Sequence, residues 1–331
     1  MEIRELLVND LNLILDPSAV KMTPSQFIAE YGGNLSKIGL LVKPPSGRVF
    51  YDSKTAPKDP VYGDFLKEFV KISSDIFDVY AVVNTLLDIY LAEDPKYSSV
   101  KSGGEKSATH ICPSEITVNY LSEVLKEIAK HPVKGVILVG NTFINRNYCF
   151  CDHCKSEFSN LAGIPQSFDF NRINVDSDLQ SKWKMWRTDK LANMITTLAE
   201  RVKQVNDKLE VYSEIYLEPS TNYISNIELE YGQSIEMLSR ETKIIFNIHP
   251  WTPVLPEANS MEYNTLISSI TGAESFKRNG VKPSLLYWNI TGEDELNIIK
   301  SISSRVSAEE VYTYNAYPSG YNQLRETHLG R

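Results

Sequence analysis

The stretch Val136-Ile137-Leu138-Val139, which runs into Gly140-Asn141, points to the fold. Four consecutive apolar residues bounded by glycines are expected of a parallel strand that is covered on both faces. The segment before it, Glu115–Lys130, places apolar residues at helical spacing, and Lys182–Val205 does so again further along. The chain around Val136 is therefore predicted to form a helix, a buried strand and a second helix.

The same alternation of apolar runs and helical patterns extends over all 331 residues. The predicted strands are, in chain order, Glu5–Val8, Ile38–Val42, Asp78–Asn84, Val136–Val139, Leu209–Tyr216, Lys243–His249, Leu285–Ile290 and Val311–Asn315. Eight strand-helix steps in this length predict an α/β fold, a single (β/α)8 TIM barrel over residues 1–331. A doubly wound sheet is the alternative, but no glycine-rich phosphate-binding loop follows any strand.

Composition narrows the classes of partner. A hydrophobic content of 42% with 23% charged residues is typical of a globular protein. The net charge of −8 argues against binding nucleic acid through its phosphates, which requires clustered Lys and Arg. No apolar run approaches the roughly 18 residues of a membrane span, and the N-terminus lacks the pattern of a secretory leader. We therefore expect a cytoplasmic protein without a membrane partner, and the sequence leaves a homo-oligomer open.

The four cysteines of the chain form a metal-ligand pattern. Cys149, Cys151 and Cys154 make a C-x-C-x-x-C cluster, and Cys112 lies upstream of it. Soft thiolate ligands suit tetrahedral Zn²⁺, and a closed shell of four sulfurs leaves no position for a reacting water. We predict one structural Zn²⁺ that staples the loop region around residues 105–165.

The cluster has three other interpretations. Four reduced thiols without a metal are the simplest. His153 lies inside the cluster and is a candidate ligand, but four cysteines already fill the shell. A zinc-dependent hydrolase is disfavoured, because no His/Asp ligand set would leave an open metal position.

Four segments of the chain together resemble the TIM-barrel glycoside hydrolases, in particular those related to the family 42 β-galactosidases. These segments are 43–51, 77–95, 110–113 and 148–158. In that family one upstream cysteine and three cysteines in C-x-C-x-x-C bind a structural zinc. The resemblance implies a TIM barrel that acts on carbohydrate, with zinc held by the cysteines at 112, 149, 151 and 154. We expect no counterpart of the trimerisation domain or the C-terminal domain of the β-galactosidases.

The sequence departs from that family at both catalytic positions. The family ends its fourth strand with an Asn-Glu pair whose glutamate is the acid/base, whereas this chain has Asn141 followed by Thr142. The family carries its nucleophilic glutamate on strand seven, where this chain has Trp288-Asn289. If the protein is a glycosidase, its acids lie elsewhere.

Glu214 is the best-placed replacement, because it interrupts an apolar strand that we expect to end at the carboxyl face of the barrel. Glycosidases need two carboxyl groups, about 5 Å apart for retention or roughly 6.5–9.5 Å for inversion. We take Asp88, four residues after Asn84, as its predicted partner. The alternatives are a Glu214 bonded only to a neighbouring strand and an Asp88 at the surface. Glu218 and Asp10 are further carboxylate candidates.

Amide and aromatic side chains at the predicted strand ends suit a sugar site. Asn247, His249 and Trp251 alternate along strand six and so share a face that we expect to point into the barrel. His249 is either an acid/base, a donor to a sugar or a structural histidine. Trp251 and Trp288 offer apolar platforms for a sugar ring. The remaining predicted ligands are amides near the tops of four strands: Asn84, Asn141, Asn289 and Asn315.

The sequence thus predicts a glycoside hydrolase that acts through carboxylates at the carboxyl face of the barrel, with a structural zinc. The alternative is a non-catalytic carbohydrate-binding or scaffold barrel that has lost the glycosidase acids. The separations among Glu214, Asp88 and Glu218 distinguish the two, because only an enzyme needs a carboxylate pair in one cleft.

Overall fold

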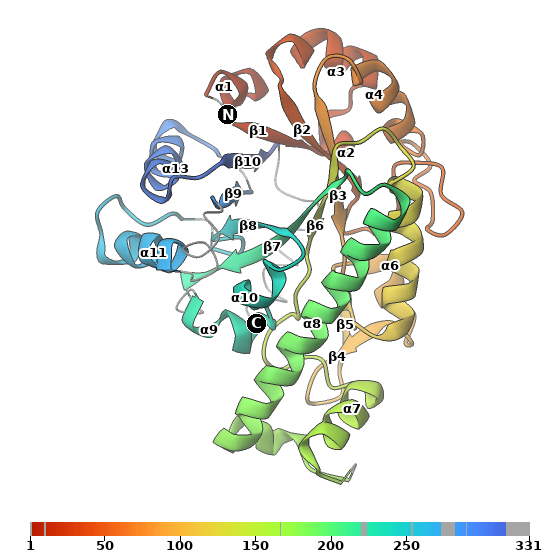
Figure 1. Cartoon of the computed structure of the whole chain (residues 1–331), viewed down its shortest axis with the longest axis vertical. Helices are drawn as coiled ribbons and strands as arrows, with labels where there is room; N and C mark the ends of the chain where they lie inside the picture. The colour runs from red at the N-terminus through yellow and green to blue at the C-terminus, as the bar shows by residue number, and fades with distance from the viewer. Residues whose placement is uncertain are drawn as a thin grey trace.

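Eight parallel strands close into a barrel in the computed structural model, in the order β1-β10-β9-β8-β7-β6-β3-β2 (Figure 1). They are β1 Asn12–Leu15, β2 Lys37–Lys43, β3 Asp78–Asn84, β6 Gly135–Val139, β7 Glu210–Leu217, β8 Lys243–Ile248, β9 Ser284–Tyr287 and β10 Glu310–Tyr314. The structure describes residues 2–9, 11–165, 167–219, 224–252, 254–272, 282–288 and 290–315. The predicted (β/α)8 TIM barrel is confirmed, as is the parallel pairing of β7 with β8.

Helices surround the barrel (Figure 1). They are α1 Ile3–Val8, α2 Pro17–Val20, α3 Pro24–Tyr31, α4 Phe65–Ser73, α5 Ile89–Ala92, α6 Glu115–Ile128, α7 Asp152–Ala162, α8 Ser177–Val205, α9 Ile224–Tyr231, α10 Ile235–Leu238, α11 Met261–Gly272 and α13 Glu293–Val306. Short 3-10 helices span Gly32–Asn34 and Phe170–Asn174. Across the described ranges, none of the helices combines the length and the apolarity that a bilayer crossing requires.

The first strand lies later than the sequence pattern indicated. Glu5–Val8, predicted as a strand, belongs to helix α1, and the strand is Asn12–Leu15. Glu2 and Glu5 form a capping box that starts the helix, and the apolar residues Ile3, Leu6 and Leu7 recur at helical spacing. The residue that directly follows the first strand is therefore Asp16. Asp10, proposed from sequence for that place, lies outside the described residues.

The chain between β3 and α8 builds a subregion on one side of the barrel. Strands β4 Ser98–Val100 and β5 Lys106–Ile111 form an antiparallel hairpin. Helix α8, whose Asp176 caps the first turn, runs from the barrel down to α7 and lies beside α6 (Figure 1). The stacked rings of Phe150, Trp183 and Trp186 pack this subregion together. All four cysteines lie in it.

Apolar side chains divide into a layer between strands and helices and a smaller layer inside the barrel. On β8, Phe246 and Ile248 pack outward, whereas Ile245 lies inside. Asn247 lies on the inner side with Ile245, because side chains alternate along a strand. The face predicted from sequence is confirmed for this strand.

The amino-terminal end of the barrel is closed by paired charges. Glu210 accepts hydrogen bonds from Tyr80 Oη at 2.6 Å and from Lys243 Nζ at 2.7 Å. Glu310 accepts hydrogen bonds from Lys37 Nζ and, at 2.7 Å, from the hydroxyl of Tyr312. Each of these two carboxylates therefore has a cation and a tyrosine hydroxyl as partners. Paired charges suit a structural closure, because a partly buried charge loses solvation and needs a partner.

Candidate functional site

Glu214 lies at the carboxyl half of β7 and is almost completely buried, with 1% of its surface exposed. Its Oε2 accepts a hydrogen bond from the backbone N–H of Gly140 at 2.7 Å. Its Oε1 accepts one from Nδ2 of Asn247 at 2.5 Å. Gly140 follows β6 and Asn247 lies on β8, so the two neighbouring strands hold the carboxylate. Both donors are neutral.

Burial raises the pKa of Glu214 from 4.5 to about 7, while the hydrogen bonds from Gly140 and Asn247 act in the opposite direction. A carboxyl group with this pKa exchanges a proton readily near neutral pH. Asn247 suits both protonation states, because its amide can donate to a carboxylate and, after rotation, accept from a carboxylic acid. The Oδ1 atom of Asn247 has no hydrogen-bond partner among the described residues. The arrangement therefore supports general acid/base chemistry at Glu214.

A small cavity adjoins Glu214 at the carboxyl end of the barrel. It holds about 10 Å³ of space for a water-sized group, which is about the volume that one water needs. Its walls come from six strands or their following loops: Leu41, Pro45, Asn84, Leu87, Val139, Gly140, Glu214, Tyr216, Trp288 and Tyr314. Three sequence-predicted residues, Glu214, Asn84 and Trp288, thus meet at one cavity. The aromatic walls Tyr216 and Tyr314 were not predicted.

Asp88 is engaged in a different arrangement. Its Oδ2 forms a completely buried ion pair with Lys43 Nζ at 2.7 Å. Its Oδ1 accepts a hydrogen bond from Leu91 N at 2.8 Å and so caps helix α5. Lys43 also donates to the carbonyl of Asn84 at 3.0 Å. Both oxygens of Asp88 are therefore occupied, and the ion pair supports the cavity wall at Asn84.

Glu218, the third carboxylate candidate, is also bonded within the protein. It lies just after β7 and is buried. Its carboxylate accepts hydrogen bonds from the backbone N–H of Trp251 and, at 2.6 Å, from the hydroxyl of Thr252. It is not among the residues that line the Glu214 cavity. Its contacts hold the turn after β8.

Two of the other predicted ligands, Asn141 and Trp251, lie beside the Glu214 cavity. Asn141 is buried, and its Nδ2 donates to Ser213 Oγ at 2.7 Å and to the Glu214 carbonyl at 3.1 Å. Trp251 packs edge-on against Trp288, with ring centroids 4.7 Å apart. Both residues therefore lie next to the Glu214 cavity, although Trp251 and Asn141 do not line it.

His249 and Asn315 have mainly structural contacts. The His249 backbone has φ +51, which ends β8, and its Nδ1 lies 3.1 Å from the Val254 carbonyl. Burial lowers the pKa of His249, so the ring is neutral at pH 7. Asn315 Oδ1 accepts the backbone N–H of Asp16 at 2.7 Å. Asn289 lies outside the described residues.

Asp16 is a carboxylate at the strand ends that the sequence interpretation missed. It follows β1 directly and is 6% exposed. Its Oδ1 accepts hydrogen bonds from Ser18 N at 2.9 Å and Ser18 Oγ at 2.7 Å. Burial raises the pKa of Tyr314, and the negative charges of Glu214 and Asp16 raise it further. Tyr314 is therefore close enough to both carboxylates to feel their charges. The signal that would have found Asp16 is the apolar run 11–15 immediately before it.

The four cysteines meet as the sequence predicted. Their sulfur atoms all lie within 4.8 Å of one another. Cys112 Sγ is 3.3 Å from Cys154 Sγ and 3.6 Å from Cys151 Sγ. Sulfurs at about 3.8 Å are what a tetrahedral ion with bonds of about 2.3 Å requires. Cys112, Cys149 and Cys154 are buried and Cys151 is half-buried, so the set fits a metal ion.

The surroundings of the cysteines also fit an anionic metal-thiolate centre. Arg187 is completely buried, and its guanidinium donates to the carbonyls of Asn145, at 2.8 Å, and Leu229. Burial lowers the pKa of Arg187 to about 9, and the charges of Glu230 and then of the Cys149 and Cys154 thiolates oppose that change. His153 instead pairs with Glu157 at 2.9 Å and does not belong to the cysteine cluster.

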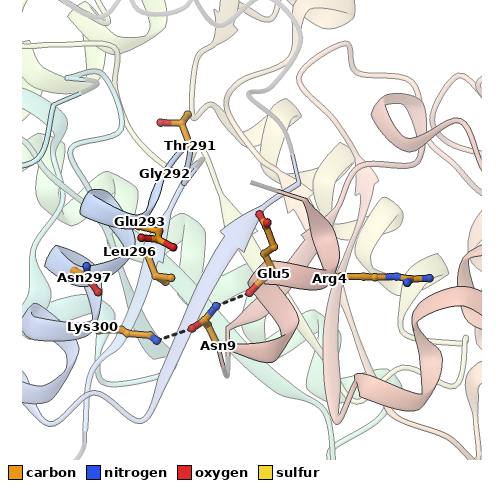
Figure 2. Close-up of a pocket in the computed structure, with 9 residues that line it drawn as sticks. All are labelled: Arg4, Glu5, Asn9, Thr291, Gly292, Glu293, Leu296, Asn297 and Lys300. Carbon is orange, nitrogen blue, oxygen red and sulfur yellow. Dashed lines mark hydrogen bonds between the residues drawn. The ribbon is translucent and has the colours of Figure 1, made fainter.

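A larger hollow of about 720 Å³ lies on the flank of the barrel between α1 and α13 (Figure 2). Two hydrogen bonds link residues of its wall: Lys300 Nζ donates to Asn9 Oδ1 at 2.6 Å, and Asn9 Nδ2 donates to the Glu5 carbonyl at 2.6 Å (Figure 2). Arg4 in its wall is largely exposed and pairs with Glu30. The hollow contains no buried carboxylate, so the Glu214 cavity is the better candidate for chemistry despite its small size.

Comparison with known proteins identifies the fold. No protein-family model and no curated protein match the chain, but solved structures do. The glycoside hydrolase domain of PgaB (BpsB) from Bordetella bronchiseptica matches with a TM-score of 0.68 and 15% identity, over 96% of this chain and 98% of that one. The catalytic domain of β-amylase from Paenibacillus polymyxa matches with a TM-score of 0.64 and 10% identity, over 97% and 98%. The chain therefore shares its TIM-barrel fold with these two structures.

A β-galactosidase from Rahnella sp. R3 has the same barrel, with a TM-score of 0.62 and 12% identity. The match covers 97% of this chain but 56% of that enzyme. The distant resemblance inferred from the cysteine pattern is therefore confirmed as one of fold. Identities of 10–15% carry no catalytic residue from one protein to another.

Proposed function

We propose that the protein is a glycoside hydrolase in which Glu214 transfers the proton at the glycosidic oxygen. The observation that carries this proposal is the environment of Glu214: a buried carboxyl group at the carboxyl end of a barrel strand, with neutral donors and a pKa of about 7. Glycosidase acids have raised pKa values for this purpose. Asn84, Trp288 and Tyr314 line the one-water cavity at Glu214, and we propose that they contact the sugar once the cavity widens on binding. Asn141, Asn247, His249, Trp251, Asn289 and Asn315 are further proposed contacts.

Asp16 and Asp88 are the two candidates for the second carboxylate of the proposed site. Asp88 was the partner proposed from sequence, but Lys43 and Leu91 N occupy both of its oxygens. Asp16 uses one oxygen for Ser18 and has Tyr314 in common with Glu214. If Asp16 is the partner, Asp16→Asn will lower turnover more than 100-fold with a small loss of stability. If Asp88 is the partner, Asp88→Asn will do so, and comparing both variants decides between them.

The decisive experiment is a hydrolysis screen with aryl glycosides and oligosaccharides. Glu214→Gln should lower turnover by about 10²–10⁴-fold, the range of general acid/base catalysis, and leave ligand binding nearly intact. Glu210→Gln is the matched control, because Glu210 lies on the same strand at the opposite end of the barrel. It should change stability and leave turnover unchanged.

A non-catalytic carbohydrate-binding barrel is the second candidate function. It is favoured by the contacts of Asp88 and Glu218, whose oxygens are taken by protein donors. An intact protein that binds an oligosaccharide and hydrolyses no glycoside, with Glu214→Gln behaving identically, would establish this function and exclude the enzyme.

We further propose that the metal at Cys112, Cys149, Cys151 and Cys154 is a structural Zn²⁺. The geometry of the four sulfurs supports a closed tetrahedral shell without a reacting water. Its role would be to tie the segment after β5 to the segment after β6. Elemental analysis of anaerobically purified protein should find one zinc per chain, which also suits a cytoplasmic location with reduced thiols.

A further inference from the structure

Strand β7 extends beyond the strand that pairs with it on one side. The register with β6 ends at Leu138 opposite Ser213, and the chain turns away at Gly140, which has φ +62. On the other side β8 continues to pair with β7 as far as Leu217. The backbone groups of Glu214 and Tyr216 that face β6 are therefore beyond its end. Buried backbone groups rarely stay unpaired.

The side chain of Gln233 takes the place of the missing strand. Its Nε2 donates to the Glu214 carbonyl at 2.9 Å, and its Oε1 accepts the Tyr216 N–H at 2.9 Å. A residue in a parallel neighbour strand makes this same pair of bonds to the residues on either side of its partner. Nε2 also donates to the Asn141 carbonyl at 3.1 Å. One completely buried amide thus binds three backbone groups around the site.

The segment that carries Gln233 is docked firmly against the loop after β6. The carbonyl of Tyr231 accepts the Phe143 N–H at 3.0 Å and the Thr142 hydroxyl at 3.2 Å. Gly232 has φ +68, and a Cβ there would come within 2.7 Å of the Phe143 ring. Only glycine permits this close approach. The position of the Gln233 amide is therefore set by packing on both sides.

We infer that Gln233 is a positioning residue for the proton transfer at Glu214. The inference rests on the proposed function. The Gln233 amide holds the Glu214 backbone from one side and the Asn141 backbone from the other. Asn141 directly follows Gly140, whose N–H donates to the Glu214 carboxylate. Gln233 therefore sets the distance between the acid and its backbone donor without touching the substrate cavity.

The test is Gln233→Met, which keeps the length of the side chain and removes all three hydrogen bonds. We expect turnover to fall about 10–100-fold with little change in KM, because small misplacements of a catalytic group have effects of this size. The pKa of Glu214, followed by carbon-13 NMR of the carboxyl group, should rise as the Gly140 bond weakens. The control is Ile299→Ala in α13, a buried site on the outer layer, which should lose stability with no change in that pKa.

One outcome for Gln233→Met would overturn the inference. If Gln233→Met is destabilised like the control and keeps both turnover and the Glu214 pKa, Gln233 is only structural. If the wild-type protein hydrolyses no glycoside, the proposed function fails, but the NMR titration still tests positioning. Should Gln233→Met not fold, Gln233→Glu retains the acceptor for Tyr216 N–H. Its turnover should fall as the introduced carboxyl group ionises against the carbonyls of Asn141 and Glu214, and a pH profile like that of the wild type would refute the role.

Discussion

The two ends of the barrel hold carboxylates in opposite electrostatic states. At the amino-terminal end, Glu210 is bonded to Lys243 and Tyr80. Burial alone would raise the pKa of Glu210, but these hydrogen bonds outweigh it and lower that pKa. At the carboxyl end, Glu214 on the same strand has only neutral donors, and burial raises its pKa to about 7.

This difference separates stability from function along a single strand. A carboxylate with a cation partner stays ionised and stabilises the fold, so Glu210 is suited to closing the barrel. A carboxyl group without a cation is unstable when ionised and is suited to exchanging a proton. Barrel enzymes commonly place chemistry at the carboxyl ends of strands and stability at the amino ends. The contrast between Glu210 and Glu214 follows this division.

Metal removal should have the largest effect on stability, and it should increase local unfolding only at the carboxyl end of the barrel. Binding of a structural zinc contributes about 10 kcal/mol or more to the folding free energy of small metal-dependent domains. We expect a smaller contribution to the unfolding free energy here. Chelation should lower the melting temperature and increase hydrogen exchange at the Phe150 amide, which bonds to the Val100 carbonyl. Amides near Tyr80 should keep their protection. An unchanged melting temperature after verified metal loss would contradict this.

Lys43→Met should give the next largest effect by leaving Asp88 buried without a cation. Breaking a buried ion pair on one side costs about 3–5 kcal/mol of unfolding free energy, and this pair has no exposed surface. The double variant Lys43→Met/Asp88→Asn should recover a large part of the loss. Urea unfolding of the three variants measures it. A single variant as stable as the wild type would show that Asp88 is not held as an anion.

The pH dependence of stability should reveal the strain at Glu214. The pKa of about 7 in the folded protein exceeds the ordinary 4.5, so the folded state favours the protonated form. Stability should therefore fall as pH rises from about 4.5 to about 7 and then level off, by about 3 kcal/mol. Glu214→Gln should remove this dependence and be more stable than the wild type at pH 8. Parallel pH profiles for the two proteins would contradict the raised pKa.

Glu310→Gln should have the smallest effect and should act only at the amino-terminal end. The change removes the charge that pairs with Lys37 and keeps an acceptor for the Tyr312 hydroxyl. Because the pair is partly exposed, we expect a loss of about 1–2 kcal/mol. The same urea titration measures it, and the pH dependence assigned to Glu214 should persist. A change in that dependence would mean that the two ends are coupled.

Most of the barrel was predictable because its strands are buried on both faces. The apolar runs at Asp78–Asn84 and Lys243–His249 predicted β3 and β8 to within one residue. The first strand was misplaced because Glu5–Val8 and the run 11–15 are both apolar, and the capping box that decides for a helix involves Glu2. That error moved attention from Asp16 to Asp10.

The candidate site was predictable only where a local pattern signals it. The cysteine spacing predicted a cluster that the structure confirms, because ligands of one metal repeat at short intervals. Glu214 was detectable as a charge within an apolar strand. The Lys43–Asp88 ion pair and the Gln233 amide were not, since each depends on residues 17 or more positions apart that only the closed barrel brings together.

Thr142 limits how this barrel can be redesigned. It occupies the position at which the resembling β-galactosidases carry their acid/base glutamate. Its buried hydroxyl lies 2.7 Å from the Phe143 carbonyl and 3.2 Å from that of Tyr231. A glutamate there would lose both contacts of this hydroxyl, and its longer side chain would have to fit at a position that is only 1% exposed, so it would displace the loop. Grafting the β-galactosidase acid onto this scaffold would therefore require rebuilding residues 141–143 together with 231–233.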